Sequence, residues 1–173
     1  MFIWGSCTKP QGYPVRFVSE EIRISIDRQE VSVNAVYYFQ NFSRELKTGL
    51  IFYPFPIDQY HYYPDSIVIA GYDFTRNDSG VNYVMRFRPN AQETVKVFYA
   101  QKLKANQTRY ILTTTQSWKS PLKQARFIVD MPSEFSKAVF SYEPDSVRLT
   151  ENRRRYYINE KNFMPDKDLI VNW

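Results

Sequence analysis

The chain has 173 residues, of which 43% are hydrophobic, 24% are charged and 17% are aromatic, and its formal net charge is +5. This composition excludes a wholly disordered chain, and the length suits one domain with a core of its own. The mild positive charge lies far from the strongly basic balance of a nucleic-acid-binding domain. We therefore expect a single domain over residues 1–173, with residues 1–14 as a candidate extended segment.

The first seven residues, MFIWGSC, allow two interpretations. They read like the tail of an apolar segment that ends in Ser-Cys, which would make Cys7 the lipid-attachment cysteine of a bacterial lipoprotein. A charged start and a longer apolar core, which a full export signal needs, are missing. This favours a buried first strand with Cys7 as a small inert hydrophobe. A single cysteine forms no intramolecular disulfide, and no apolar run is long enough to be a transmembrane segment.

Apolar residues alternate with other residues along most of the chain. Ile22, Ile24 and Ile26 begin this period of two, which continues through residues 31–39 and 81–87. Short stretches rich in Asn, Asp, Pro or Gly separate the alternating runs, at 77–80, 88–93, 104–107 and 149–153. No stretch carries a convincing helical stripe. The pattern predicts an all-β fold, an antiparallel β-sandwich of about ten to twelve short strands with little helix.

Residues 52–63, FYPFPIDQYHYY, hold six aromatic rings and the only histidine of the chain. The strand that leads into them has apolar residues on both faces, which indicates a strand covered on both sides or facing a partner. The rings beyond it either pack over a sandwich edge or contact a ligand, as in carbohydrate-binding modules. Packing is favoured because large aromatic side chains mostly pack. Trp118 either closes one end of the sandwich or binds a ligand. The ligand-binding candidates are Tyr60, His61, Tyr62, Tyr63 and Trp118.

Positive charges gather in residues 86–104. If residues 81–88 and 94–104 pair as a hairpin, five basic side chains share one exposed face and call for counter-ions. Most such runs are simply the solvated side of a strand, and stacking aromatic rings are scarce here, so we expect no nucleic acid partner. The residues of this candidate basic face are Arg86, Arg88, Lys96, Lys102 and Lys104.

Four segments, read together, resemble an uncharacterised bacterial envelope family catalogued as domain of unknown function 4424. They are SEEIRISIDRQEVSVNAVYYFQNFS, LKTGLIFYPFPID, RYILTTTQSWKSPLKQARFIVDM and YYINEKNFMPDKDLIVNW. The resemblance covers both ends of the chain, whereas the middle, residues 60–105, matches poorly. It implies an exported β-rich domain and brings no catalytic residues with it.

Enzyme signatures are largely absent. One histidine and one cysteine cannot build a His/Cys metal cage, and five glycines leave little room for a phosphate-binding loop. His61 near Asp58 and Asp65 imitates part of a triad, but no Gly-x-Ser-x-Gly turn accompanies it. We expect no catalytic residues, no metal and no cofactor. The predicted function is a non-catalytic, extracytoplasmic (periplasmic, cell-surface or secreted) binding or assembly domain of the bacterial envelope, with a protein or glycan partner. The alternatives are a carbohydrate-binding module using residues 52–63 and a hydrolase with an unrecognised site.

Overall fold

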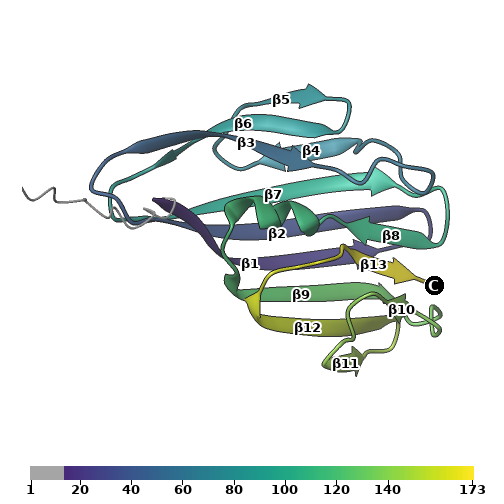
Figure 1. Ribbon diagram of the computed structural model, residues 1–173. Coiled ribbons are helices and arrows are strands. Elements are labelled where there is room, and N and C mark those ends of the chain that lie inside the picture. Colours follow the sequence, from purple (N-terminus) through teal and green to yellow (C-terminus); the bar gives the residue numbers. More distant parts are fainter. Residues whose placement is uncertain (1–13) are drawn as a thin grey trace, which may run out of the picture.

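The computed structural model describes residues 14–173 as a β-sandwich of two layers (Figure 1). The larger layer is a seven-stranded sheet, made of β1 (Val15–Ile26), β2 (Glu30–Asn41), β4 (Ser66–Ile69), β7 (Gln92–Lys102), β9 (Leu122–Pro132), β11 (Ser146–Leu149) and β12 (Arg153–Phe163). Its order is β11-β12-β9-β1-β2-β7-β4. All neighbours are antiparallel except β1 and β9, which run parallel. The predicted sandwich is confirmed, with this one parallel pair as an addition.

The second layer is split into two three-stranded sheets. One has the order β3-β6-β5, and the other the order β10-β13-β8. Their strands are β3 (Lys47–Pro54), β5 (Phe74–Asn77), β6 (Gly80–Phe87), β8 (Gln107–Tyr110), β10 (Val139–Phe140) and β13 (Leu169–Asn172). A 3-10 helix, η1 (Thr113–Trp118), follows β8 and lies against β1. Within residues 14–173, β3 and β8 each pair with a strand on one side only, so the layer is interrupted between them.

The core lies between the layers and follows the predicted alternation. Ile22, Ile24 and Ile26 are all buried, as are the inward residues of β2 and β7. A β-bulge interrupts the pairing of β1 with β2 between Phe17 and Ser19. An extra residue in a strand reverses which positions face inward. For this reason Phe17 before the bulge and Glu20 after it both point to the interior, where both are buried.

The predicted hairpin of residues 81–88 with 94–104 is wrong. β6 pairs with β3 and β5 in one layer, whereas β7 pairs with β2 and β4 in the other. The connection around Asn90, whose φ is 50°, carries the chain across the sandwich instead of folding it back in one sheet. Turn-forming residues suit both geometries, so local sequence could not separate them.

A second difference concerns residues 107–118. The run TRYILTTT suggests one strand because of its β-branched residues, but β8 ends at Tyr110 and η1 begins at Thr113. The Asp168 carboxylate accepts hydrogen bonds from the backbone N–H groups of Leu112 and Thr113, at 2.9 and 3.1 Å. A side chain far along the sequence thus stabilises the start of this helix by satisfying its free donors.

The outer face of the β3-β6-β5 sheet carries three exposed apolar residues. Leu50 and Phe52 on β3 are 71% and 45% exposed, and Val84, opposite Leu50 on β6, is also exposed. Ile51 and Tyr53 face the core. Among residues 14–173, the strand is therefore covered on its inner face only. In residues 14–173 no helix is both long and apolar enough to cross a bilayer.

Candidate functional site

A pocket of about 80 Å³ lies at the interruption of the second layer. Strands β1, β2 and β7 supply its floor, and β3, β6, β8 and η1 supply its walls. Nine of its fifteen lining residues are aromatic, and no Lys, Arg or His is among them. The lining residues are Phe17, Glu20, Tyr37, Phe39, Ile51, Phe52, Tyr53, Pro54, Tyr83, Tyr99, Tyr110, Ile111, Thr114, Thr115 and Trp118.

Glu20 places a buried carboxyl group in this aromatic pocket. It stands opposite Tyr37 of β2, its side chain is almost fully buried, and its Oε1 atom has no hydrogen-bond partner. Burial raises the pKa of Glu20 from 4.5 to about 8, so the carboxyl group is mostly protonated at neutral pH. Buried polar atoms are nearly always paired in folded proteins, so this unpaired oxygen marks the pocket as a candidate binding site.

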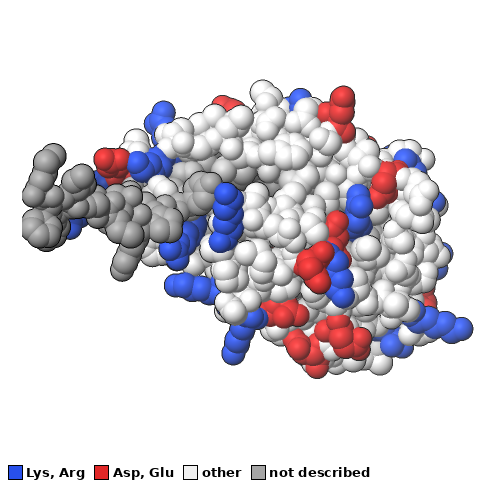
Figure 2. All heavy atoms as spheres, in the orientation of Figure 1, with Lys and Arg blue, Asp and Glu red and all other residues white. Residues whose placement is uncertain are grey.

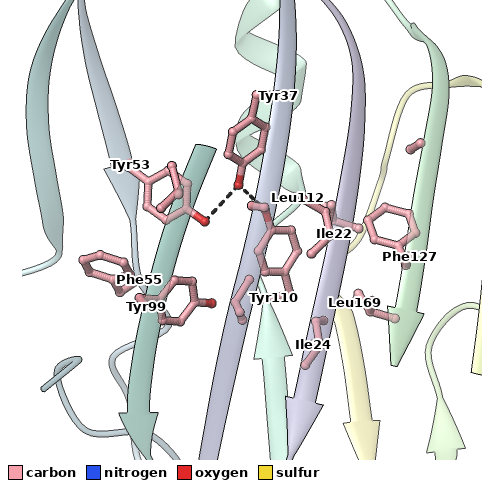
Figure 3. Close-up of a cluster of buried hydrophobic side chains, with 14 of the residues drawn as sticks. Ile22, Ile24, Tyr37, Tyr53, Phe55, Tyr99, Tyr110, Leu112, Phe127 and Leu169 are labelled. Carbon is pink, nitrogen blue, oxygen red and sulfur yellow. Dashed lines mark hydrogen bonds between the residues drawn. The ribbon is translucent and has the colours of Figure 1, made fainter. Parts of the chain in front are cut away.

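Three tyrosine hydroxyl groups, from Tyr37, Tyr53 and Tyr110, meet between the layers (Figure 3). All three residues line the same pocket as Glu20. The Tyr37 hydroxyl donates to that of Tyr53 at 2.9 Å and is also hydrogen-bonded to that of Tyr110. Burial raises the pKa of Tyr53 to about 12 and holds those of Tyr37 and Tyr110 well above 10, with Glu20 adding to each rise. All three groups therefore stay neutral. Three O–H groups joined by two hydrogen bonds leave one proton free to donate elsewhere.

Trp118 closes one end of the pocket. Its ring centroid lies 6.2 Å from that of Phe17 and 5.2 Å from that of Phe39, and these two rings stack at 5.1 Å. Trp118 is half-buried, so it lies over the end of the sandwich and also on the pocket wall. Of the five ligand-binding candidates predicted from sequence, it alone lines this pocket.

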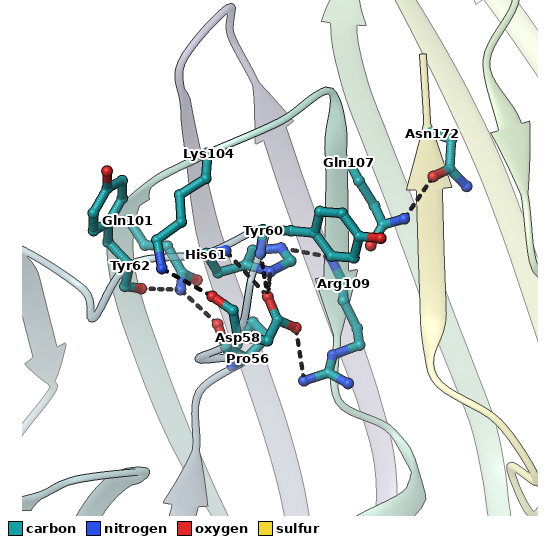
Figure 4. A network of polar contacts seen from close by, with 10 residues as sticks. All are labelled: Pro56, Asp58, Tyr60, His61, Tyr62, Gln101, Lys104, Gln107, Arg109 and Asn172. Atoms are coloured by element: carbon teal, nitrogen blue, oxygen red, sulfur yellow. Dashed lines mark hydrogen bonds and ion pairs between the residues drawn. The ribbon is translucent and has the colours of Figure 1, made fainter.

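His61 lies in a separate polar network that fixes the aromatic loop (Figure 4). The ring is fully buried, its Nε2 accepts the backbone N–H of Arg109 at 3.1 Å, and its Nδ1 lies 2.7 Å from Asp58 Oδ1. Because Nε2 is an acceptor, Nδ1 must carry the proton. Burial lowers the pKa of His61 even though Asp58 opposes the shift. Both ring nitrogens are engaged, so neither is available to a substrate in this arrangement.

Further contacts tie the same loop to its neighbours. Asp58 accepts the backbone N–H groups of Tyr60 and His61 and pairs with the Arg109 guanidinium at 3.1 Å. The buried Gln101 amide donates to the backbone oxygens of Pro56 and Tyr62. These bonds hold residues 56–62 against β7 and β8, which indicates a structural latch.

The three loop tyrosines do not form one continuous platform. Tyr60 is half-buried. Tyr62 is 52% exposed, but the Lys104 ammonium lies 4.6 Å from the centre of its ring. The Tyr63 hydroxyl donates to the Gly80 carbonyl, and its ring packs edge-on against a core phenylalanine. Tyr62 and Tyr63 border an open groove between the ends of β2 and β7.

The candidate basic face is not one surface. Arg86 lies on β6 and Arg88 directly after it, whereas Lys96 and Lys102 lie on β7 in the opposite layer and Lys104 follows β7. The prediction failed because it depended on the hairpin that does not form. Arg88 pairs with Glu93 at 2.7 Å, in line with the expected counter-ion. On the face drawn in Figure 2, basic side chains are scattered and interleaved with acidic ones.

Two remaining sequence predictions concern Cys7 and metals. Cys7 lies outside the described residues. Within residues 14–173, no group of three or more His, Cys, Asp or Glu side chains is placed to hold a metal ion. Glu20 was missed from sequence because the alternation was followed only from Ile22 onward. Counting back in steps of two from Ile22 would have placed it on the inner face.

Fold and pocket together define a β-sandwich domain with a small cavity between its layers. The chain belongs to the family described as Domain of unknown function (DUF4424), whose match covers residues 77–171, more than half of the sequence. The resemblance noted from sequence is thereby confirmed. The match includes part of the middle segment that resembled the family poorly, and it does not extend to residues 19–58.

Several solved structures share this fold. A candidate nutrient-binding protein of Legionella pneumophila has a TM-score of 0.64 and 18% identity, with 91% of this chain and 66% of that one covered. The M1 zinc metallopeptidase of Deinococcus radiodurans has a TM-score of 0.56 and 11% identity, with 92% and 42% covered. At such identities the likeness shows the fold alone. The chain thus spans just under two thirds of the first protein and less than half of the second. No curated protein matches the chain.

Proposed function

We propose that this chain is a non-catalytic binding domain that holds a small molecule in the pocket between β3 and the β8–η1 segment. The observation that carries the proposal is the unpaired Oε1 atom of Glu20 inside that pocket. A buried carboxyl group without a partner reduces stability, so an apolar side chain would serve the fold better. A ligand that supplies the missing hydrogen bond gives this residue a use, and ligand sites typically combine apolar walls with a few polar groups.

The proposal places the domain outside the cytoplasm, in the bacterial cell envelope. Its support is the family resemblance, which implies export, and the likeness of fold to a candidate nutrient-binding protein. The engagement of both His61 nitrogens supports a non-catalytic role. Fractionation of the native host tests the compartment, and mass spectrometry of the N-terminal peptide tests whether Cys7 carries lipid.

Ligand binding in the pocket is testable with a variant that obstructs its mouth. Thr114 is an exposed residue of η1 and lines the pocket, so Thr114→Trp adds bulk at the opening without disturbing the core. Thr94→Trp, on an exposed position of β7 outside the pocket, is the matched control. Fragments detected by ligand-observed NMR are expected to bind the wild type and the control and to lose binding to Thr114→Trp. Equal binding to all three proteins refutes the proposed site.

A carbohydrate-binding module using residues 52–63 is the second candidate. The exposed ring of Tyr62 beside the open groove favours it, since aromatic rings stack on sugars. Glycan-array binding that disappears in Tyr62→Ala and persists in Thr114→Trp supports this function over the first. Unchanged glycan binding in Tyr62→Ala removes it.

A further inference from the structure

The pocket has one acidic lining residue and no basic one. Glu20 is the acidic residue. The other titratable groups that line the pocket come from five strands, and burial raises the pKa of each, so all are neutral. They are Tyr37, Tyr53, Tyr83, Tyr99 and Tyr110. An anionic ligand would meet a carboxyl group and no positive partner, whereas a cation would gain a counter-ion.

The walls of the pocket also suit a cation. Nine aromatic side chains surround the carboxyl group, and aromatic rings attract ammonium groups through the negative potential of their faces. A polyol is a poorer match, because it needs many hydrogen-bond partners. Two of the three O–H protons of the Tyr37–Tyr53–Tyr110 hydroxyl chain are already used within it, so this chain offers a polyol only one free donor.

The size of the pocket limits what can enter. A cavity of about 80 Å³ has room for a compact group but not for a large ligand. Phe52 of β3 and Thr114 of η1 are the exposed residues of its lining, which places the opening between these two elements. A ligand would place its head inside the pocket and extend the remainder outward through this opening.

We propose that the pocket binds a small organic cation, a protonated amine or quaternary ammonium head group, with Glu20 as its counter-ion. This inference rests on the proposed function, since it names the ligand class of the same pocket. Glu20 must be ionised to pair with the cation. Because its pKa is about 8 in the free protein, binding at pH 7 displaces close to one proton into solvent. Affinity therefore falls about tenfold for each pH unit below 7.

Three probes of similar size and different charge test the inference: n-propylammonium chloride, n-propanol and sodium propionate. For a fragment of this size the best dissociation constant is roughly 0.1 to 10 mM. NMR titrations at pH 6, 7 and 8.5 are expected to show binding of n-propylammonium only, about tenfold weaker at pH 6 than at pH 7. Calorimetry in two buffers of different ionisation enthalpy is expected to give release of about one proton at pH 7.

Two variants assign the effect to the carboxyl group. Glu20→Gln keeps the side-chain shape and is expected to lose n-propylammonium binding and its pH dependence. Glu21→Gln, the same change at the exposed neighbouring position, is expected to bind like the wild type. Proton release by the wild type is independent of any variant, so the inference remains testable if Glu20→Gln fails to fold.

Other outcomes overturn the inference and separate its failure from that of the proposed function. Preference for propionate, or equal binding of n-propanol that Glu20→Gln leaves unchanged, refutes a cation site. If none of the three probes binds while other fragments bind in a manner sensitive to Thr114→Trp, the cation inference fails and the proposed function stands. If no fragment is sensitive to Thr114→Trp either, both fail.

Discussion

The replacement Glu20→Gln is expected to change how the stability of the ligand-free protein depends on pH. The pKa of Glu20 is about 8 in the folded protein against an ordinary value of 4.5. Between these values the folded state holds the proton more tightly than the unfolded state, so stability is greatest at the acidic end and falls as pH rises. Each pH unit inside the window removes about 1.4 kcal/mol from the free energy of unfolding. The whole window from pH 4.5 to 8 amounts to about 5 kcal/mol.

Glutamine at position 20 cannot ionise, so the variant lacks this loss. Its free energy of unfolding should match that of the wild type near pH 4.5 and exceed it increasingly up to pH 8. Urea denaturation followed by tryptophan fluorescence at pH 5, 6, 7 and 8 measures the difference. Glu21→Gln, at an exposed position, should run parallel to the wild type. A constant difference between Glu20→Gln and the wild type across this range would show that Glu20 is not a buried, protonated carboxyl group.

Three further predictions concern other parts of the structure. Tyr37→Phe removes the hydroxyl group that bonds to those of Tyr53 and Tyr110 and leaves both without this partner. Urea denaturation should show that the free energy of unfolding falls by about 1–3 kcal/mol. An unchanged free energy of unfolding would mean that the three hydroxyl groups are not hydrogen-bonded. His61→Phe should speed amide hydrogen exchange at Arg109. Burial lowers the pKa of His61 below its usual 6.5 in the folded protein, so the wild type should lose stability as pH falls below that value, and His61→Phe should not. An unchanged pH profile in the variant would contradict the buried, neutral His61 of this network. Asp168→Ala should cost about 1–2 kcal/mol and increase proteolysis near Leu112, where protection equal to the wild type would show that η1 does not need this cap.

The alternation of apolar and other residues predicted most of the fold, because it depends on neighbouring residues alone. A strand half-covered by a core must alternate, and Ile22, Ile24 and Ile26 do so with their side chains buried as expected. The same alternation extended backwards reaches Glu20, so one member of the pocket was within reach of the sequence. The bulge after Phe17 could not be predicted from the sequence, because nothing in the neighbouring residues marks an inserted position.

The rest of the site depends on contacts distant in sequence. Tyr37, Tyr53 and Tyr110 come from three strands in both layers, so their meeting requires the chain to change layer after β2 and again after β7. Local turn chemistry does not distinguish such crossings from hairpins. Likewise, the Trp118 ring reaches the pocket only because η1 replaces the end of a predicted strand. The cap that supports η1, Asp168, lies more than fifty residues away.

The parallel pairing of β1 with β9 has a consequence for how the domain assembles. Ser19 of β1 pairs with Gln124 of β9, so one edge of β1 stays unpaired until a strand more than one hundred residues later in the chain has been made. Contacts of such long sequence separation slow folding, because a large loop must close before they form. During synthesis the chain up to Lys102 can therefore form β1, β2 and β7 as an incomplete sheet, whose open edge can pair with other chains. A chaperone that binds the incomplete chain until β9 has formed would therefore protect this protein most at that stage.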